Sequence, residues 1–281
     1  MAQSQLEAAN AALSKIGART LLTSVSTSGT TQEERTVASR IDICKRSVLR
    51  MQPWKFAMKR KKILPYQDVA VSNVTYVSSE LIEVTHSSIS TLAAGHYVTL
   101  SGIEGATGAN GSWEVTTTSG TVTRVTAIGI TSSTLLGTYT ASSTDYIRRS
   151  PAFEYSYLYD LPSDCLRVWK IDDETANPSW KVEGGQILSD NSSLEIRYVK
   201  DSTDYTLMDP LFYEAWATYT AWDISLELGR DMTVKDRLME DFIKLLGKAR
   251  FVDATENSQS SLDASDWTGS RLNATSDLWI T

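Results

Sequence analysis

The chain is poor in the residues that most catalytic and metal centres need, with two His and two Cys among its 281 residues. So few imidazoles and thiols nearly exclude His-based catalytic triads and leave too few ligands for most structural zinc sites. Cys44 and Cys165 lie far apart, which indicates a reducing compartment in which each thiol is a small apolar side chain. We therefore expect no enzyme, no cofactor and no metal ion.

Long apolar runs are also missing. No stretch approaches the ~18–20 consecutive apolar residues that a membrane span requires. The first 20 residues have neither the basic nor the apolar region of a secretion signal. We expect a protein without a membrane partner.

Positive charge is in deficit, with 27 Lys and Arg against 34 Asp and Glu and a net charge of -7. This balance excludes sequence-specific DNA binding by bulk attraction. The charge is nevertheless polarised, because residues 45–62 contain no acid whereas the segment after Asp201 is acidic. Two interpretations remain open: two solvated faces, or a basic rim that contacts an acidic neighbour or DNA phosphate. The densest part of the rim consists of Lys59, Arg60, Lys61 and Lys62.

Aromatic residues are plentiful by comparison, with eight Trp and twelve Tyr. Such side chains are common at interfaces, where one end packs and the other end stays polar. The composition therefore favours an assembly protein over an enzyme.

Residues 5–52 carry the patterns of two helices. Two pairs have a hydroxyl residue followed three positions later by glutamate, the capping-box pattern: Ser4 with Glu7, and Thr31 with Glu34. Apolar residues then recur at helical spacing until Pro53. We predict that the two helices pack as an antiparallel pair along one apolar seam.

A second helical pair is predicted near the C-terminus. Asp209 and Pro210 are typical of a helix start, and this helix runs to about Leu228. It is apolar on most sides, which predicts packing on a partner as well as on its own core. Its candidate subunit-interface residues are Phe212, Trp216 and Trp222. Another helix is expected over residues 234–251.

The middle of the chain has a different composition. Ser and Thr make up 29 of the 81 residues from Asp68 to Arg148, a stretch that holds both His and lacks Pro and Lys. Short apolar runs separated by Ser and Gly turns indicate a small all-β module. Pro65 and Pro151 bracket it, so we predict an inserted β domain at 67–150 that folds alone.

These patterns predict an α+β fold. N- and C-terminal helix pairs form an antiparallel helical bundle, with a small β-sheet and an inserted all-β, sandwich- or barrel-like domain. The expected domains are a body at 1–66 and 151–252, the inserted domain at 67–150, and an extended C-terminal docking arm at 253–281.

Three short motifs favour ordinary structural roles over chemistry. His86 and His96 are expected to be turn or surface residues, although a metal pair with Glu83 or Glu104 stays open. Glycine recurs every third residue over 102–111 without a following phosphate-binding helix, which predicts a flexible hairpin loop. The acidic cluster consists of Asp172, Asp173 and Glu174 and is expected to be a solvated turn, with glycoside hydrolysis as the alternative.

The C-terminal tail is polar but keeps large anchors, which a disordered tail normally lacks. Trp and Arg dominate interface hot spots, so a partner groove is expected, with packing on the chain's own body as the alternative. The anchors are Trp267, Arg271, Leu278 and Trp279.

Several segments together resemble a known family. In chain order they are LEAANAALSKIGARTLLTS, SVLRMQPWKFAMKR, FEYSYLYDLPSDCLRVWKI, DPLFYEAWATYTAWDISLEL and DWTGSRL. This series is similar to the tail tubular protein A family, the head-to-tail connector or adaptor proteins of short-tailed bacteriophages. The resemblance covers residues 1–66 and 151–281 and leaves out the inserted module.

The resemblance implies a non-enzymatic virion protein of the tail neck, assembled in the host cytoplasm. Members of the family form a ring of twelve subunits beneath the portal, around a DNA channel. The implied partners are other copies of the chain, the portal protein, the tail nozzle protein and double-stranded DNA that passes without sequence preference. The four tail anchors become portal-docking residues, and the basic rim is a candidate contact for DNA or portal.

A second hypothesis is a carbohydrate-binding or hydrolytic tail component that acts through the inserted β domain. It requires an exposed aromatic platform, which within that domain only Trp113 and a few Tyr could supply.

Overall fold

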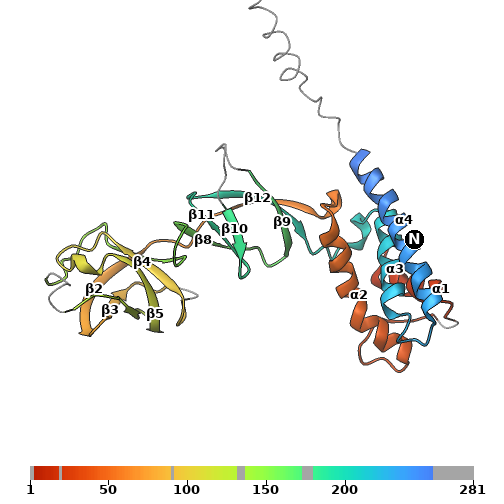
Figure 1. The fold of residues 1–281 in the computed structure, drawn as a ribbon, viewed down its shortest axis with the longest axis horizontal. Coiled ribbons are helices and arrows are strands. Elements are labelled where there is room, and N and C mark those ends of the chain that lie inside the picture. Colours follow the sequence, from red (N-terminus) through yellow and green to blue (C-terminus); the bar gives the residue numbers. More distant parts are fainter. Residues whose placement is uncertain (1–2, 19–20, 90–91, 132–136, 173–179, 256–281) are drawn as a thin grey trace, which may run out of the picture. The chain divides into compact units, whose positions relative to one another are not determined.

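The computed structural model describes residues 3–18, 21–89, 92–131, 137–172 and 180–255 (Figure 1). The chain divides into two compact units. We call residues 1–58 with 201–281 the helical unit, and residues 59–200 the strand unit. No helix among the described residues is long and apolar enough to cross a membrane.

The helical unit contains the four α-helices of the described chain. They are α1 (Gln5–Lys15), α2 (Gln32–Met51), α3 (Pro210–Ile224) and α4 (Met232–Thr255). Short 3-10 helices lie at Lys55–Ala57 and Tyr205–Leu207 in this unit and at Thr107–Ala109 in the strand unit. The predicted N-caps are confirmed, because Ser4, Thr31 and Asp209 each accept a hydrogen bond from a backbone N–H of the first turn.

Helix α3 is the centre of the helical unit and packs against α1, α2 and α4. Its buried side chains point in all directions, as expected for a helix that is apolar on most sides. The predicted pairing of α1 with α2 along one seam is wrong, since both helices contact α3 far more than they contact each other.

The predicted fold class is wrong as well. The described chain is mostly β, with four helices and about 12 strands in three antiparallel sheets and a C-terminal helix pair, and it is not an N- and C-terminal helical bundle. Strand-forming segments outside the β module build two sheets with a core of their own, so they are not an accessory to the helices. Capping boxes are strong local signals and short alternating runs are weak ones, which led the sequence prediction to favour helices.

Two three-stranded sheets share one core in the strand unit. Their strands are β1 (Met58–Ile63), β8 (Tyr157–Asp160), β9 (Cys165–Asp172), β10 (Trp180–Glu183), β11 (Gln186–Ser189) and β12 (Leu194–Lys200). The strand orders are β1-β12-β9 and β10-β11-β8, so β1 is an edge strand. The core comprises Ile63, Tyr159, Ile171, Ile187, Leu194, Ile196 and Tyr198.

The remaining strands close into a barrel of order β2-β3-β6-β5-β4-β7. They are β2 (Val69–Ser78), β3 (Leu81–His86), β4 (Tyr97–Ser101), β5 (Gly111–Ser119), β6 (Val122–Thr126) and β7 (Tyr146–Ser150). Closure pairs every strand on both sides and so leaves no open edge within the barrel. Independent folding of residues 67–150 stays a prediction.

The glycine-rich segment 102–111 connects the antiparallel strands β4 and β5, which confirms the predicted hairpin, and it also packs into the barrel core. Ile103, Ala106 and Ala109 are buried in the barrel interior, between the glycines. At Gly102 the backbone has a φ of +77°, and an added Cβ would lie 2.3 Å from the carbonyl oxygen of Thr144. Gly102 and Gly105 therefore allow a close approach of neighbouring backbone that a side chain would block.

Candidate nucleic-acid interface

The basic rim predicted from the sequence lies on β1, the edge strand of its sheet. Its four cations, Lys59, Arg60, Lys61 and Lys62, are all exposed. Charged side chains on an edge strand prevent it from pairing with strands of other molecules. Because side chains alternate along a strand, Arg60 and Lys62 lie on one face, and Lys59 and Lys61 lie on the face of the buried Ile63.

Lys59 is engaged within the chain and is a structural residue rather than a free contact. Its Nζ donates to Asp164 Oδ2 at 2.8 Å, and Asp164 Oδ1 accepts from the hydroxyl of the buried Tyr198 at 2.9 Å. The hydrogen bond to Lys59 holds the pKa of Asp164 below its usual value, and the same bond raises the pKa of Lys59. Lys59 therefore fixes the turn before β9.

The Asp164 contact predicts an acid-sensitive contribution to stability. The folded-state pKa of Asp164 is depressed, so its stabilisation is present above about pH 4 and is lost as the pH falls through the folded pKa. We expect Asp164→Asn to cost about 1 kcal/mol at pH 7 and less at about pH 3, measured by thermal unfolding. The exposed Glu183→Gln in the same unit is the control. An equal loss at both pH values would contradict this assignment.

A shallow hollow of about 270 Å³ lies where β1 meets β12. Its lining consists of Arg60, Lys61, Lys62, Glu195, Ile196 and Arg197. Lys62 Nζ lies 3.6 Å from Glu195 Oε1, and both side chains are more than 60% exposed, so this ion pair is weak. Four cations and one carboxylate therefore line this hollow.

A second hollow of about 600 Å³ shares Lys61 and Lys62 with the first. It also contains Arg149 and Asp160, together with Ile63, Leu64 and Pro65. The guanidinium of Arg149 lies over the ring of Tyr66, 4.8 Å from its centroid, and donates to the Tyr66 hydroxyl at 2.9 Å. That hydroxyl donates in turn to Asp160. These contacts fix the position of Arg149 and occupy the one carboxylate that lines this hollow.

Arg149 and Arg197 were not among the predicted site residues. They follow Lys62 by more than eighty positions in sequence, and only the sheet and barrel bring them to the same edge. Alternation on the strand of Leu194–Lys200 could have shown that Arg197 points away from the core residues Ile196 and Tyr198. No sequence pattern indicates Arg149.

Comparison with known protein families and with characterised proteins finds no match to this chain. The function is therefore argued from the residues and from the structure.

Two of the three predicted interface residues on α3 are buried in the chain's own core. Phe212 and Trp216 have no exposed surface; Phe212 packs edge-on against Trp54, with ring centroids 5.0 Å apart. This corrects the interface prediction for both, because a side chain without exposed surface offers no contact to a neighbour. Trp222 is half-buried, stacks on Tyr219, and stays a predicted interface residue.

Several other residues singled out in the sequence lie outside the described residues. These are the portal-docking residues Trp267, Arg271, Leu278 and Trp279, and the acidic Asp173 and Glu174. Residues 253–255, which were predicted to belong to the docking arm, are instead part of α4, which continues to Thr255, and Asp253 Oδ1 accepts a hydrogen bond from the backbone of Lys55 at 3.0 Å.

His86 and Trp113, which the sequence offered as candidates for metal or sugar binding, have structural partners within the barrel. His86 was expected at a turn or at the surface, but it is buried at the end of β3, with its Nε2 2.8 Å from Thr123 Oγ1. Glu83 pairs with Arg124 at 2.8 Å. Among the described residues no group of three or more His, Cys, Asp or Glu could hold a metal ion. Trp113 packs against the barrel core and donates its Nε1–H to the carbonyl of Ala109, so it is not a fully exposed platform for a sugar.

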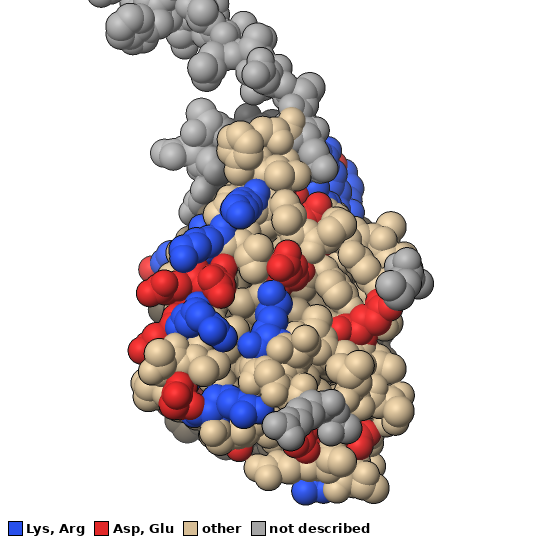
Figure 2. Space-filling model, turned by 90° about the vertical axis from the view of Figure 1, so that its right-hand side faces the viewer, with Lys and Arg blue, Asp and Glu red and all other residues tan. Residues whose placement is uncertain are grey.

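The basic and acidic segments seen in the sequence form ion pairs with each other within the helical unit. Residues of α2 contact acidic residues that follow position 200: Arg40 Nε lies 2.8 Å from Asp223 Oδ2, and Arg46 Nε lies 2.7 Å from Asp201 Oδ2. On the face drawn in Figure 2, Lys and Arg accordingly lie among Asp and Glu.

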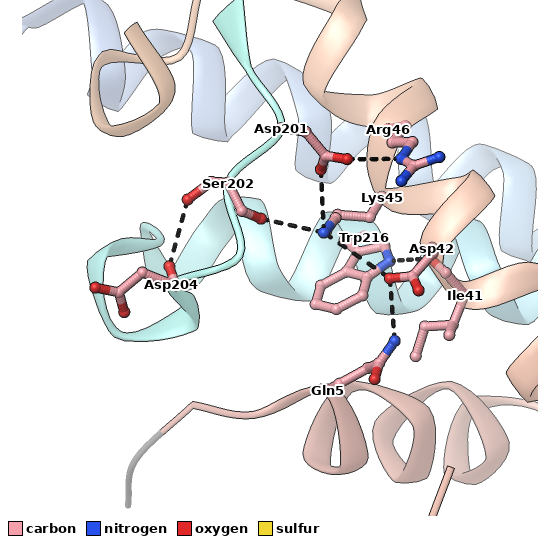
Figure 3. Close-up of polar contacts among 9 residues, drawn as sticks. All are labelled: Gln5, Ile41, Asp42, Lys45, Arg46, Asp201, Ser202, Asp204 and Trp216. Carbon is pink, nitrogen blue, oxygen red and sulfur yellow. Dashed lines mark hydrogen bonds and ion pairs between the residues drawn. The ribbon is translucent and has the colours of Figure 1, made fainter. Parts of the chain in front are cut away.

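The buried centre of this pairing is Lys45, whose side chain is 3% exposed (Figure 3). Its Nζ donates to the carbonyl of Ser202 at 3.1 Å and lies 3.2 Å from Asp201 Oδ1 and 3.8 Å from Asp42 Oδ1. Gln5 of α1 donates to the same Asp42 oxygen at 3.0 Å. The cluster ties α1, α2 and the segment before α3 together, and it leaves β1 as the part of the basic group that is available to a partner.

Proposed function

We propose that this chain is a structural virion protein, a head-to-tail adaptor whose copies form a ring between portal and tail nozzle and line the channel for DNA ejection. One observation carries the proposal. Three of the segments that resemble the adaptor family, distant in sequence, contribute side chains to one core.

The N-terminal segment LEAANAAL supplies the buried Ala8, Ala9, Ala12 and Leu13 of α1, which packs on α3. The segment PWKFA supplies Trp54 and Phe56, and DPLFYEAW supplies Phe212. Trp54 and Phe56 lie 5.0 and 4.9 Å from the Phe212 ring, both edge-on. The resemblance therefore follows the residues that build the helical unit, which supports a shared framework.

The test is association with portal. The full chain is mixed with purified portal rings and the mass is followed by light scattering. We expect a defined complex, and we expect removal of residues 256–281 to abolish it while Asp253 keeps its contact with Lys55. Unchanged binding of the shortened chain would contradict the docking arm.

A matched pair of tail variants sharpens this test. Trp267→Ala with Trp279→Ala is expected to weaken portal binding at least ~10-fold, as for hot-spot aromatics. Ser261→Ala with Ser276→Ala, in the same arm, is expected to leave it unchanged. Failure of the intact chain to bind portal at all would contradict the adaptor function itself.

A further inference from the structure

The two hollows beside β1 are neighbours, because Lys61 and Lys62 line both of them, and we call them together the basic path. We infer that this path holds the phosphate backbone of double-stranded DNA, an inference that rests on the proposed adaptor function. Five cations line the path: Arg60, Lys61, Lys62, Arg149 and Arg197. Its two carboxylates, Asp160 and Glu195, are respectively hydrogen-bonded to Tyr66 and weakly paired with Lys62.

The spacing of the cations suits a repeating anion. Arg60 and Lys62 point to the same side of an extended strand and are therefore about 6.6 Å apart along it. Each strand of B-DNA carries one phosphate per ~3.4 Å of helix axis, so several phosphates lie within reach of cations at this separation. Contacts of this kind position a backbone without reading sequence, as a conduit for any DNA requires.

The lining of the hollow between β1 and β12 favours nucleic acid over a protein partner. Protein interfaces have cores that are depleted of charge and enriched in aromatic side chains. The hollow between β1 and β12 is lined by four cations, one carboxylate and the side of Ile196. Long cations around a shallow surface are typical of phosphate contacts.

The net negative charge of the chain restricts its attraction for DNA to the basic path. With a net charge of -7 the chain repels DNA at long range, so attraction acts only where the backbone reaches the path. Binding by a single chain is therefore weak and strongly salt-dependent, which is compatible with DNA that must slide past.

Fluorescence anisotropy with a labelled duplex of about 30 base pairs and mixed sequence tests the inference on the full chain. If about three phosphates are neutralised, affinity falls roughly 40-fold between 50 and 200 mM salt. Arg60→Gln, Lys62→Gln and Arg197→Gln together are expected to remove most of this salt dependence and to weaken binding at least ~10-fold at low salt.

The control is a triple variant with the same change in net charge, placed away from the basic path. Arg237→Gln, Lys244→Gln and Lys248→Gln alter three exposed cations of α4 in the helical unit and are expected to leave the affinity within about twofold. Arg60→Lys with Lys62→Arg keeps both charges and is expected to bind like the unchanged chain. This second variant separates a lost contact from a folding defect, together with the circular dichroism spectrum of each protein.

Besides a failure of the unchanged chain to bind the duplex, three results would overturn the inference. They are equal weakening by both triple variants, binding of a single strand but not of the duplex, and loss of portal binding with DNA binding intact. The last would assign the path to an acidic protein surface. Portal association of the same variants is measured in parallel, so normal portal binding with no DNA binding by the unchanged chain refutes only this inference.

Discussion

Replacing Asp201 by alanine is expected to destabilise the helical unit by about 3–5 kcal/mol. Asp201 is the nearest carboxylate to the buried ammonium of Lys45, at 3.2 Å, and the alternative, Asp42, lies 3.8 Å away and is half exposed. Without Asp201, Lys45 keeps a charge in a site that is 3% exposed, with the Ser202 carbonyl as its remaining close partner. The large cost comes from the stranded charge and not from the net strength of the ion pair.

Urea unfolding followed by circular dichroism at about 222 nm measures this loss, because the four α-helices of the described chain belong to the helical unit. Asp236→Ala, on the exposed side of α4, is the control and is expected to change stability by less than about 0.5 kcal/mol. Lys45→Met together with Asp201→Ala is expected to recover most of the loss, since an apolar side chain of similar length needs no counter-charge. A loss below about 1 kcal/mol for Asp201→Ala would show that Lys45 is solvated.

Replacing Trp216 by alanine is expected to cost about 3–5 kcal/mol. The indole is fully buried, stacks on Tyr205 with an interplanar angle of 7°, and meets Tyr213 edge-on with centroids 5.6 Å apart. Its Nε1–H donates to the carbonyl of Ile41 at 3.0 Å, which ties α3 to α2 (Figure 3). Alanine removes the ring contacts and leaves a cavity at the centre of the unit.

Two variants divide that loss into its parts. Trp216→Phe keeps a ring but removes the donor to Ile41, and is expected to cost about 1–2 kcal/mol. Trp222→Ala, on the half-buried side of the same helix, is expected to cost less than half as much as Trp216→Ala. Equal losses for the two tryptophans would contradict the assignment of Trp216 to the core and Trp222 to the surface.

The local features of the fold were predictable from sequence. Ser4, Thr31 and Asp209 cap helices where the capping patterns placed them, because a cap depends on residues only two or three positions away. The basic rim at residues 59–62 was also predicted, since charge is read along a single segment. The balance between helix and strand was not, because short strands acquire their stability from partners elsewhere in the chain.

The candidate site was only half predictable for the same reason. Lys59 to Lys62 are adjacent in sequence, so the basic rim was predictable. In the structure, however, Lys59 is hydrogen-bonded to Asp164 and leaves the site, whereas Arg149 and Arg197 join it. Likewise, Phe212 and Trp216 are residues of a type that is common at interfaces, but they lie in the buried core of the helical unit. A helix that is apolar on most sides gives no indication of which side meets its own chain.

The sequence by itself determined the helix starts, the scarcity of reactive groups, the net charge of -7 and its polarity along the chain. Each of these is a sum over residues or an interaction within one helical turn. Only the tertiary structure decided which charges cancel and which remain available. Lys59 and Asp164 are 105 positions apart, and Arg46 and Asp201 are 155 apart. Contacts at such separations depend on how the sheets and helices pack. That packing leaves the face of β1 that carries Arg60 and Lys62 as an exposed basic surface.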